Sequence, residues 1–330
     1  MNARSSHSLS FVARIALLST LLVTIPPGRA SAQTAPSTTS TSPANSALQD
    51  QADHGDAGAQ YRLAKRMLSL NPTPAETQTA LDYLRASVAQ SNPNAQFYLG
   101  YLYEHGKFLP QDYALAFQNY EAATRVHYPV AENNLASLYQ HGQGVPKNLG
   151  KAYEWYLASA QHGDPVGQLN LANLYFGGDG VRRDIKQAVY WLRLSADAGL
   201  PEAQNNLAYF YFYGVELPRD YDEAARLIRL AAGKNLPGAQ TSLGYLYEQG
   251  KGVRLDYVAA YSWYTRASLN GDHSGETHRR RLAQIMTPNQ IQQAKAILNP
   301  SSPATAVSAT VASGDPEPAA VTSAYSLLNH

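Results

Sequence analysis

The chain has 330 residues, with 26 Lys and Arg against 25 Asp and Glu, 23 Tyr and no Cys. This balance lacks the positive field of nucleic-acid-binding proteins, so nucleic acid is not an expected partner. The lack of Cys excludes disulfides, thiolate zinc sites, cysteine nucleophiles and a lipid-bearing cysteine.

Residues 1–32 have the pattern of a secretory signal peptide. Arg4 and Arg14 precede an apolar run at 15–25, and the small residues at 30–32 suit a signal peptidase. The run is shorter than the about 20 residues that a bilayer requires, although an uncleaved N-terminal anchor is the alternative. We therefore expect cleavage after residue 32, export, and no transmembrane segment in the mature chain.

Two further segments have little to bury. Residues 33–46 are mostly Ser, Thr and Pro, and residues 299–330 have a similar composition over most of their length. Such segments cannot offset the entropy lost on folding. We therefore predict a flexible linker at 33–46 and a disordered tail at 299–330.

Between these segments, a pattern recurs every 36 residues. An Ala-Gln pair begins each copy, as Ala-Glu in the third and Gly-Gln in the fourth, a Leu follows four positions later, and a Tyr or Met follows eight positions later. Offsets of 0, 4 and 8 lie on one face of a helix, so each copy opens with an amphipathic first helix. The residues that begin the six copies are Ala59, Ala95, Ala131, Gly167, Ala203 and Ala239.

A second set of columns predicts a second helix in each copy. Ala recurs at residues 80, 116, 152, 188, 224 and 260, and only Ser or Ala stands seven positions later. Between the helices, a recurring Gly is suited to a left-handed helix end and a recurring Asp or Asn to an N-cap. A single helix pair cannot bury its apolar face alone. We therefore predict an all-α protein, a right-handed α-α superhelix of six helix-turn-helix repeats over residues 47–298.

The two ends of this array depart from the pattern. The first copy has Asn71-Pro72 where later copies have glycines, which indicates an N-terminal cap, and a half-repeat remnant precedes it at 47–55. Near the C-terminal end, Thr287-Pro288-Asn289-Gln290 has the form of a capping box and opens a final helix that extends to about residue 298.

The repeated unit resembles the Sel-1-like repeat, a relative of the tetratricopeptide repeat with a longer turn between its helices. The resemblance is carried by Ala-Gln-x-x-Leu, a Tyr three residues after the following Gly or Ala, Gly-x-Gly-Val in the turn, and Ala-x-x-Trp-Tyr. It implies an exported bacterial interaction scaffold. We accordingly expect a monomeric, periplasmic, non-catalytic adaptor without a cofactor, which binds a protein or peptide of the cell envelope. Secretion outside the cell is the alternative location.

Two other functions remain as alternatives. Some members of this family regulate a sensor kinase or envelope polysaccharide machinery. Others are linked to peptidoglycan or beta-lactam hydrolysis, but those carry a cysteine pair in each repeat, which this chain lacks. The acidic turn residues are also spread one per repeat rather than gathered, so no catalytic residue is predicted.

The resemblance also indicates where a partner binds, because first helices line the concave surface of tetratricopeptide arrays. Asn134, Asn170 and Asn206 recur at one position there, and a carboxamide can pair with the backbone of an extended peptide. The alternative is that these asparagines tie adjacent repeats together. Aromatic residues would add contact area, unless they are buried against the second helix. These residues are Phe97, Tyr98, Tyr101, Phe176, Tyr209, Phe212 and Tyr245.

Two histidines recur as well. His105 and His141 each stand just before a turn glycine, but the next copies are Gly177, Tyr213 and Gln249. A metal site needs further ligands that converge on the same point. The sequence columns therefore predict no metal site.

Overall fold

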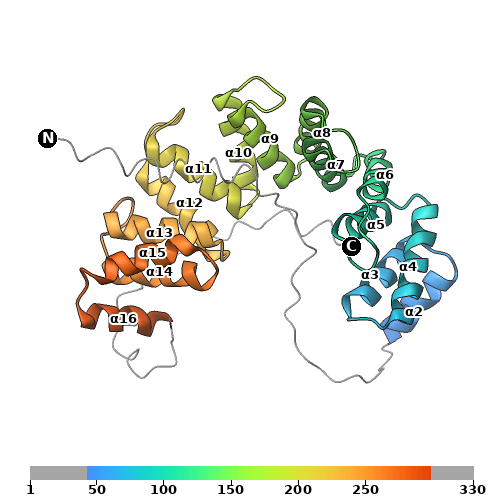
Figure 1. Ribbon diagram of the computed structural model, residues 1–330, viewed down its shortest axis with the longest axis horizontal. Helices are drawn as coiled ribbons and strands as arrows, with labels where there is room; N and C mark the ends of the chain where they lie inside the picture. The colour runs from blue at the N-terminus through green and yellow to red at the C-terminus, as the bar shows by residue number, and fades with distance from the viewer. Residues whose placement is uncertain (1–42, 299–330) are drawn as a thin grey trace. The chain divides into compact units, whose positions relative to one another are not determined.

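A computed structural model describes residues 43–298, in which all regular structure is α-helical (Figure 1). The predicted signal peptide, the C-terminal tail and the linker up to residue 42 lie outside the described residues. The helices are α2 (Pro43–Asp53), α3 (Ala57–Ser69), α4 (Pro74–Ala89), α5 (Pro93–His105), α6 (Tyr113–Thr124), α7 (Pro129–His141), α8 (Leu149–Gln161), α9 (Pro165–Gly177), α10 (Ile185–Asp197), α11 (Pro201–Tyr213), α12 (Tyr221–Gly233), α13 (Pro237–Gln249), α14 (Tyr257–Leu269), α15 (His273–Ala283) and α16 (Pro288–Leu298).

The helices follow the predicted pairing, so the fold is an α-solenoid of six helix-turn-helix repeats. Repeat 1 is α3 and α4, repeat 2 is α5 and α6, and so on to repeat 6, which is α13 and α14. The chain divides into two compact units after Asp220, within repeat 5. Consecutive helices pack against each other from α2 to α11 in the first unit and from α12 to α15 in the second, where α16 packs on α14.

The N-terminal helix α2 begins earlier than composition suggested. Residues 43–46, assigned to the linker by their Ser and Pro content, are helical. Proline is tolerated in the first turn of a helix, because the missing N–H has no intrahelical partner there, so Pro43 is compatible with a helix start. Farther along α2, Ala52 is buried in a cluster with Ala59 and Leu63 of α3.

The turn within each repeat follows its glycines and caps. The left-handed C-cap residues are Gly106, Gly142, Gly178, Gly214 and Gly250, as predicted. The second glycine of the turn also permits a close approach, since a β-carbon on Gly144 would lie 2.3 Å from the Tyr113 carbonyl oxygen. The second helices of repeats 2, 3, 4 and 6 are N-capped by the side chains of Asp112, Asn148, Asp184 and Asp256.

Recurring polar side chains tie the helices together through main-chain carbonyls. Gln60 donates to the carbonyl of Ala52 at 3.2 Å, and the Gln of the same column in repeats 4, 5 and 6 makes the same contact eight residues back. Within repeats, Ser159 donates to Pro129 at 2.9 Å and Ser195 to Pro165 at 2.6 Å. The Ala-Gln pair and the small-residue column thus hold neighbouring helices at a fixed separation.

The core combines the predicted leucine column with a tyrosine of the second helix in repeats 2, 3 and 6, which in repeats 3 and 6 is the Tyr of the Ala-x-x-Trp-Tyr motif. The six leucines of this column, one in each repeat, are all buried. Tyr120, Tyr156 and Tyr264 are among the largest fully buried side chains. Each hydroxyl donates to a polar residue of the preceding first helix, to Glu104 (2.5 Å), Gln140 (2.8 Å) and Glu248 (2.6 Å) respectively. A buried hydroxyl needs such an acceptor, so these bonds position the second helix against the first.

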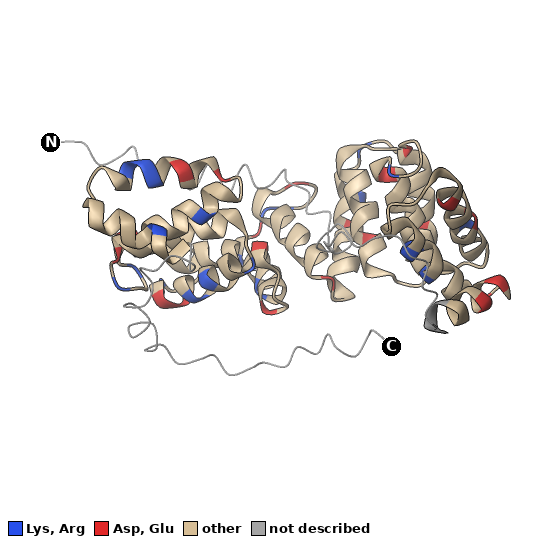
Figure 2. Ribbon diagram, turned by 90° about the horizontal axis from the view of Figure 1, so that it is seen from below, with Lys and Arg blue, Asp and Glu red and all other residues tan. Residues whose placement is uncertain are grey.

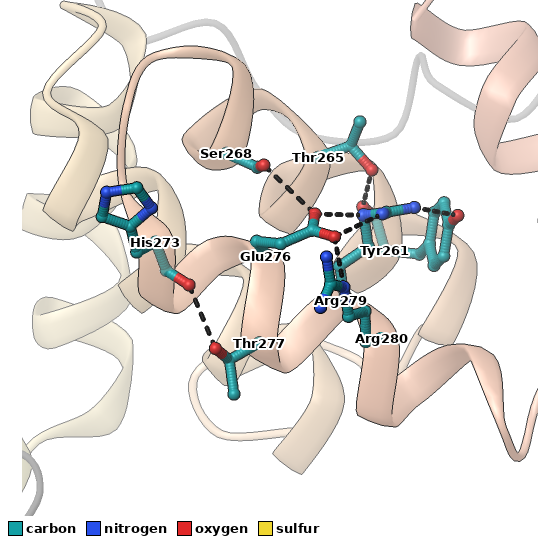
Figure 3. Close-up of polar contacts among 8 residues, drawn as sticks. All are labelled: Tyr261, Thr265, Ser268, His273, Glu276, Thr277, Arg279 and Arg280. Carbon is teal, nitrogen blue, oxygen red and sulfur yellow. Dashed lines mark hydrogen bonds and ion pairs between the residues drawn. The ribbon is translucent and has the colours of Figure 1, made fainter.

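Helix α15 makes charged contacts near the C-terminal end of the array (Figure 3). Glu276 accepts hydrogen bonds from Arg279 and Arg280, and Arg279 also donates to the Tyr261 hydroxyl at 2.8 Å. The bonds from Arg279 and then Arg280 lower the pKa of Glu276 to about 2. Arg281 pairs with Glu248 at 2.6 Å, so each arginine of this run has an acidic partner.

Charge is spread along the described helices, and both signs occur in each unit (Figure 2).

The predicted capping box at the start of α16 is confirmed, because Thr287 and Gln290 bond each other reciprocally. Among residues 43–298, no helix is both long and apolar enough to cross a membrane.

Candidate partner-binding surface

In repeats 1 and 2, the predicted tyrosines are largely used within the fold. Tyr98 and Tyr101 of α5 lie with nearly parallel rings whose centroids are 6.3 Å apart, and the Tyr101 ring stacks on His105 at 4.1 Å. Tyr61 of α3 meets Tyr98 edge-on at 6.1 Å. Burial raises the pKa of Tyr98 to about 12. Both Tyr98 and Tyr101 are buried.

Phe97 makes its ring contacts with other residues than Tyr61, Tyr98 and Tyr101. Its ring packs against Tyr120 at 5.7 Å and against Tyr128 at 5.5 Å. Phe97 therefore fills space between repeat 2 and the start of repeat 3, as expected if it packs against the second helix.

The asparagine column is partly engaged in bonds between repeats. Asn134 is buried and hydrogen-bonds the hydroxyl of Tyr120. Asn133 donates to Asn134 at 3.1 Å, and Asn170 of the next repeat donates to Asn133 at 2.8 Å. These bonds are of the kind expected if the column ties repeats together. Asn133 stands one position before the asparagine column. Its hydrogen bond depends on the side chain that the first helix of the next repeat places beside it.

Repeats 4 and 5 bring the predicted aromatic residues together. Phe176 of α9 meets Phe210 of α11 edge-on at 6.1 Å, and Tyr209 contacts both Phe210 and Tyr213. Phe212 lies against Tyr213 at 4.9 Å. Phe210 is buried beneath them, whereas the others are partly exposed. We call the four partly exposed residues, Phe176, Tyr209, Phe212 and Tyr213, the aromatic patch.

The aromatic patch has a charged border. The guanidinium of Arg183 lies 5.8 Å from the centre of the Phe176 ring. Arg183 also lines an open hollow of 820 Å³, together with residues of both signs that include Arg182, Asp184 and Glu216. Neither Tyr213 nor Arg183 was singled out from the sequence, although a search for aromatic residues one turn beyond Tyr209 would have found Tyr213.

The last predicted aromatic, Tyr245, belongs to the unit that begins at Tyr221. It is partly buried against the cluster that contains Tyr261, Tyr264 and Leu282.

The recurring histidines bond their own helices, because the Nδ1 of His105 contacts the Tyr101 carbonyl at 3.0 Å and that of His141 contacts the Ser137 carbonyl at 2.9 Å. Of the predicted site residues, the structure therefore gathers three, Phe176, Tyr209 and Phe212, in the aromatic patch.

Comparison with known proteins identifies the repeat. The Sel1 repeat matches at residues 57–92, 93–125, 129–164, 165–200, 201–236 and 237–272. The chain belongs to the Sel1 repeat family. Sel1 repeat proteins typically mediate protein–protein interactions, and their fold is generally a non-catalytic scaffold.

Two solved structures are similar to this Sel1 repeat protein. One is a protective antigen present in uropathogenic Escherichia coli strains, with 28% identity, a TM-score of 0.66, and coverage of 76% of this chain and 54% of the antigen. This chain therefore spans about half the length of that protein. The other is a Sel1 repeat protein from Oxalobacter formigenes, with 25% identity, a TM-score of 0.62, and coverage of 74% and 96% respectively. No match was found among curated proteins.

Proposed function

We propose that this chain is a non-catalytic adaptor of the bacterial cell envelope, which binds a peptide or protein partner through the aromatic patch. The observation that carries the proposal is the patch itself, in which four partly exposed aromatic rings of α9 and α11 are linked by ring contacts, two of them to the buried Phe210. Aromatic rings offer a large contact area and lose little rotamer entropy when they bind.

The surroundings of the patch suit a protein interface. Arg183 and the charged hollow form a polar rim beside the rings, the arrangement found around interface centres. On α11, Asn206, Tyr209 and Tyr213 are spaced three and four residues apart, so they occupy one helix face. A partner segment that packs on the rings could thus hydrogen-bond the carboxamide of Asn206.

The envelope location rests on residues 1–32, whose pattern is that of an export signal. The expected mature protein begins at Gln33 and lies in the periplasm. Mass spectrometry of the N-terminus of protein recovered from the periplasmic fraction checks both points. An intact N-terminus on cytoplasmic protein would contradict them.

The binding proposal is tested by crosslinking in intact cells with a double variant, Phe176→Ala with Tyr209→Ala. Loss of two central interface aromatics costs about 2 kcal/mol or more, so we expect partner capture to fall at least roughly 30-fold. Tyr190→Ala is the matched control, because Tyr190 is an aromatic residue on the second helix α10 and is 54% exposed. Circular dichroism checks that both variants keep their helicity.

The double variant and the control variant can each contradict the proposal. Undiminished capture by the double variant would show that the patch does not bind the partner. An equal loss in Tyr190→Ala would show that the effect does not belong to the first-helix face.

A further inference from the structure

The Gln of the Ala-Gln pair makes a second contact in repeats 1 and 6. Gln90 donates its amide to the Oε1 of Gln60 at 2.9 Å, and Asn270 does the same to Gln240 at 2.9 Å. The two members of each pair are 30 residues apart, and the second one caps the C-terminal end of the repeat's second helix. A pair of neutral amides is thus one solution that this fold uses at the junction between repeats.

Repeat 3 departs from that solution at three positions. Glu132 replaces the glutamine, and His162 stands where Gln90 and Asn270 stand. His127, in the turn before α7, has φ of +55°, at a position where L side chains are disfavoured. The residues at this position in the other repeats are Gly55, Ser91, Gly163, Gly199, Asn235 and Gly271, all with positive φ.

These three departures converge in space. The Nδ1 of His162 lies 2.7 Å from Oε2 of Glu132, and the Nδ1 of His127 lies 3.8 Å from Oε1 of the same carboxylate. The two imidazole rings are 4.9 Å apart between centroids. One donor atom from each of the three residues lies within 4.8 Å of the other two. The turn before α7, helix α7 and the C-terminal end of α8 therefore each contribute one side chain of a type that binds metal ions.

The carboxylate of Glu132 requires a positive charge nearby. Its side chain is 1% exposed, and among residues 43–298 its ion-pair partners are these two histidines. A buried carboxylate is costly unless a cation and hydrogen bonds compensate it. Imidazole supplies a charge only when it is protonated, whereas neutral imidazole offers a lone pair to a metal ion.

We propose that His127, Glu132 and His162 bind a divalent transition-metal ion of the Zn²⁺ type. Two imidazole nitrogens and one carboxylate oxygen form a ligand set that Zn²⁺ accepts, with a fourth position left for water. The nitrogen donors disfavour Mg²⁺ and Ca²⁺, which prefer oxygen. The His127 side chain is 74% exposed, so it is free to turn toward the buried carboxylate and close the site.

A bound ion would join the α6–α7 turn to the C-terminal end of α8. The hydrogen that His162 shares with Glu132 leaves when the metal takes that nitrogen, so binding releases protons and weakens in acid. This site is separate from the aromatic patch and does not depend on the proposed partner. The sequence columns missed it because His127 and His162 do not recur with the spacing that drew attention to His105 and His141.

The test is a titration of tag-free, metal-stripped protein with Zn²⁺ by calorimetry, and with Co²⁺ by visible absorption. We expect one ion per chain, with a Kd of about 1 μM or tighter, and a melting temperature that rises when Zn²⁺ is present. His127→Gly restores the residue found in most other repeats. Glu132→Gln with His162→Asn restores the amide pair of repeat 6. Each variant is expected to bind at least roughly tenfold more weakly while keeping its helicity.

The matched control is His105→Gln with His141→Gln, which removes two histidines outside the cluster and leaves binding unchanged. The proposal is overturned if the wild-type protein binds no stoichiometric Zn²⁺, if His127→Gly binds as tightly as wild type, or if the control variant loses binding. NMR of the wild-type imidazoles provides an independent check. Zn²⁺ must shift the signals of His127 and His162 and not those of His105 and His141.

Discussion

Repeat 3 and repeat 6 have the same helices and the same two side-chain junctions, but their charges are placed in opposite junctions. Within repeat 3, the buried Tyr156 bonds a neutral Gln140, whereas the junction with the next turn pairs Glu132 with His162. Repeat 6 has the reverse arrangement: Tyr264 bonds Glu248, and a neutral Gln240 meets Asn270.

In these two repeats, each junction keeps its hydrogen bond whether or not the acceptor carries a charge. In repeats 3 and 6, the carboxylate has a cationic partner, Arg281 for Glu248 and the two histidines for Glu132. The charged junctions are therefore the places where the sequence of a repeat can acquire an additional property without a change of backbone.

The strongest way to break the comparison is Gln240→Glu. The glutamine is 1% exposed, and a carboxylate there would face Asn270 without a cation. We expect a loss of about 3 kcal/mol or more of unfolding free energy at pH 7, as for other uncompensated buried charges. Burial holds the folded-state pKa of such a carboxyl above its unfolded value, so the loss shrinks as pH falls.

Urea unfolding at pH 7 and at about pH 4 measures this effect. The reverse substitution, Glu132→Gln, is the control, because glutamine keeps a partner in His162 and should cost less than about 1 kcal/mol. Equal costs for the two substitutions would contradict the role assigned to the cation.

Removal of the tyrosine hydroxyls sharpens the comparison. Tyr264→Phe leaves Glu248, whose side chain is 10% exposed, with Arg281 alone, and we expect a cost of about 1–3 kcal/mol. Tyr156→Phe leaves the partly exposed amide of Gln140, which water can reach, and we expect about 0.5–1.5 kcal/mol. Denaturation midpoints provide the measurement, and a larger cost for Tyr156→Phe would overturn the ranking.

The smallest expected effect concerns the C-terminal cap that follows repeat 6. The folded-state pKa of Glu276 is about 2, below its ordinary value of 4.5, because Arg279 and Arg280 bond its ionised form. The ionised Glu276 therefore stabilises the fold at pH values above its ordinary pKa, and this stabilisation is lost as pH falls toward 2. We expect Glu276→Gln to lower the melting temperature slightly at pH 7 and to flatten its decline in acid.

Asp164 offers a control of the opposite sign. Burial raises the pKa of this N-cap, so its ionisation opposes folding as pH rises, and Asp164→Asn keeps the cap acceptor. Thermal melts of both variants across the acid range distinguish the two cases. The same pH response in both would show that neither carboxyl controls the slope.

Much of this fold is predictable from sequence because its signals are local. A Pro in the first turn, a left-handed Gly and an N-cap Asp each act within a few residues of where they stand, and the period of 36 repeats them. The start of α2 was missed because the composition of residues 43–46 resembles that of a linker, whereas a helix there depends on packing against α3.

The candidate sites were less predictable, for a physical reason. Whether Asn134 faces a ligand or Tyr120 depends on the side chain that a neighbouring helix brings to it. Phe176, Tyr209 and Phe212 of the aromatic patch were among the predicted residues, because they stand at corresponding positions on the first helices α9 and α11. His127, Glu132 and His162 are 5 and 30 residues apart and form no recurring column, so only their distances reveal the cluster.

The bonds from Gln60, Gln168 and Gln204 to main-chain carbonyls of the preceding helix have a consequence for how such chains can change over time. Every residue carries a carbonyl, so a tie of this kind does not depend on the identity of the side chain it reaches. A 36-residue unit could be duplicated, lost or moved by recombination and still find its contact in the new neighbour. The length of the array can thus evolve independently of the surface that each unit displays.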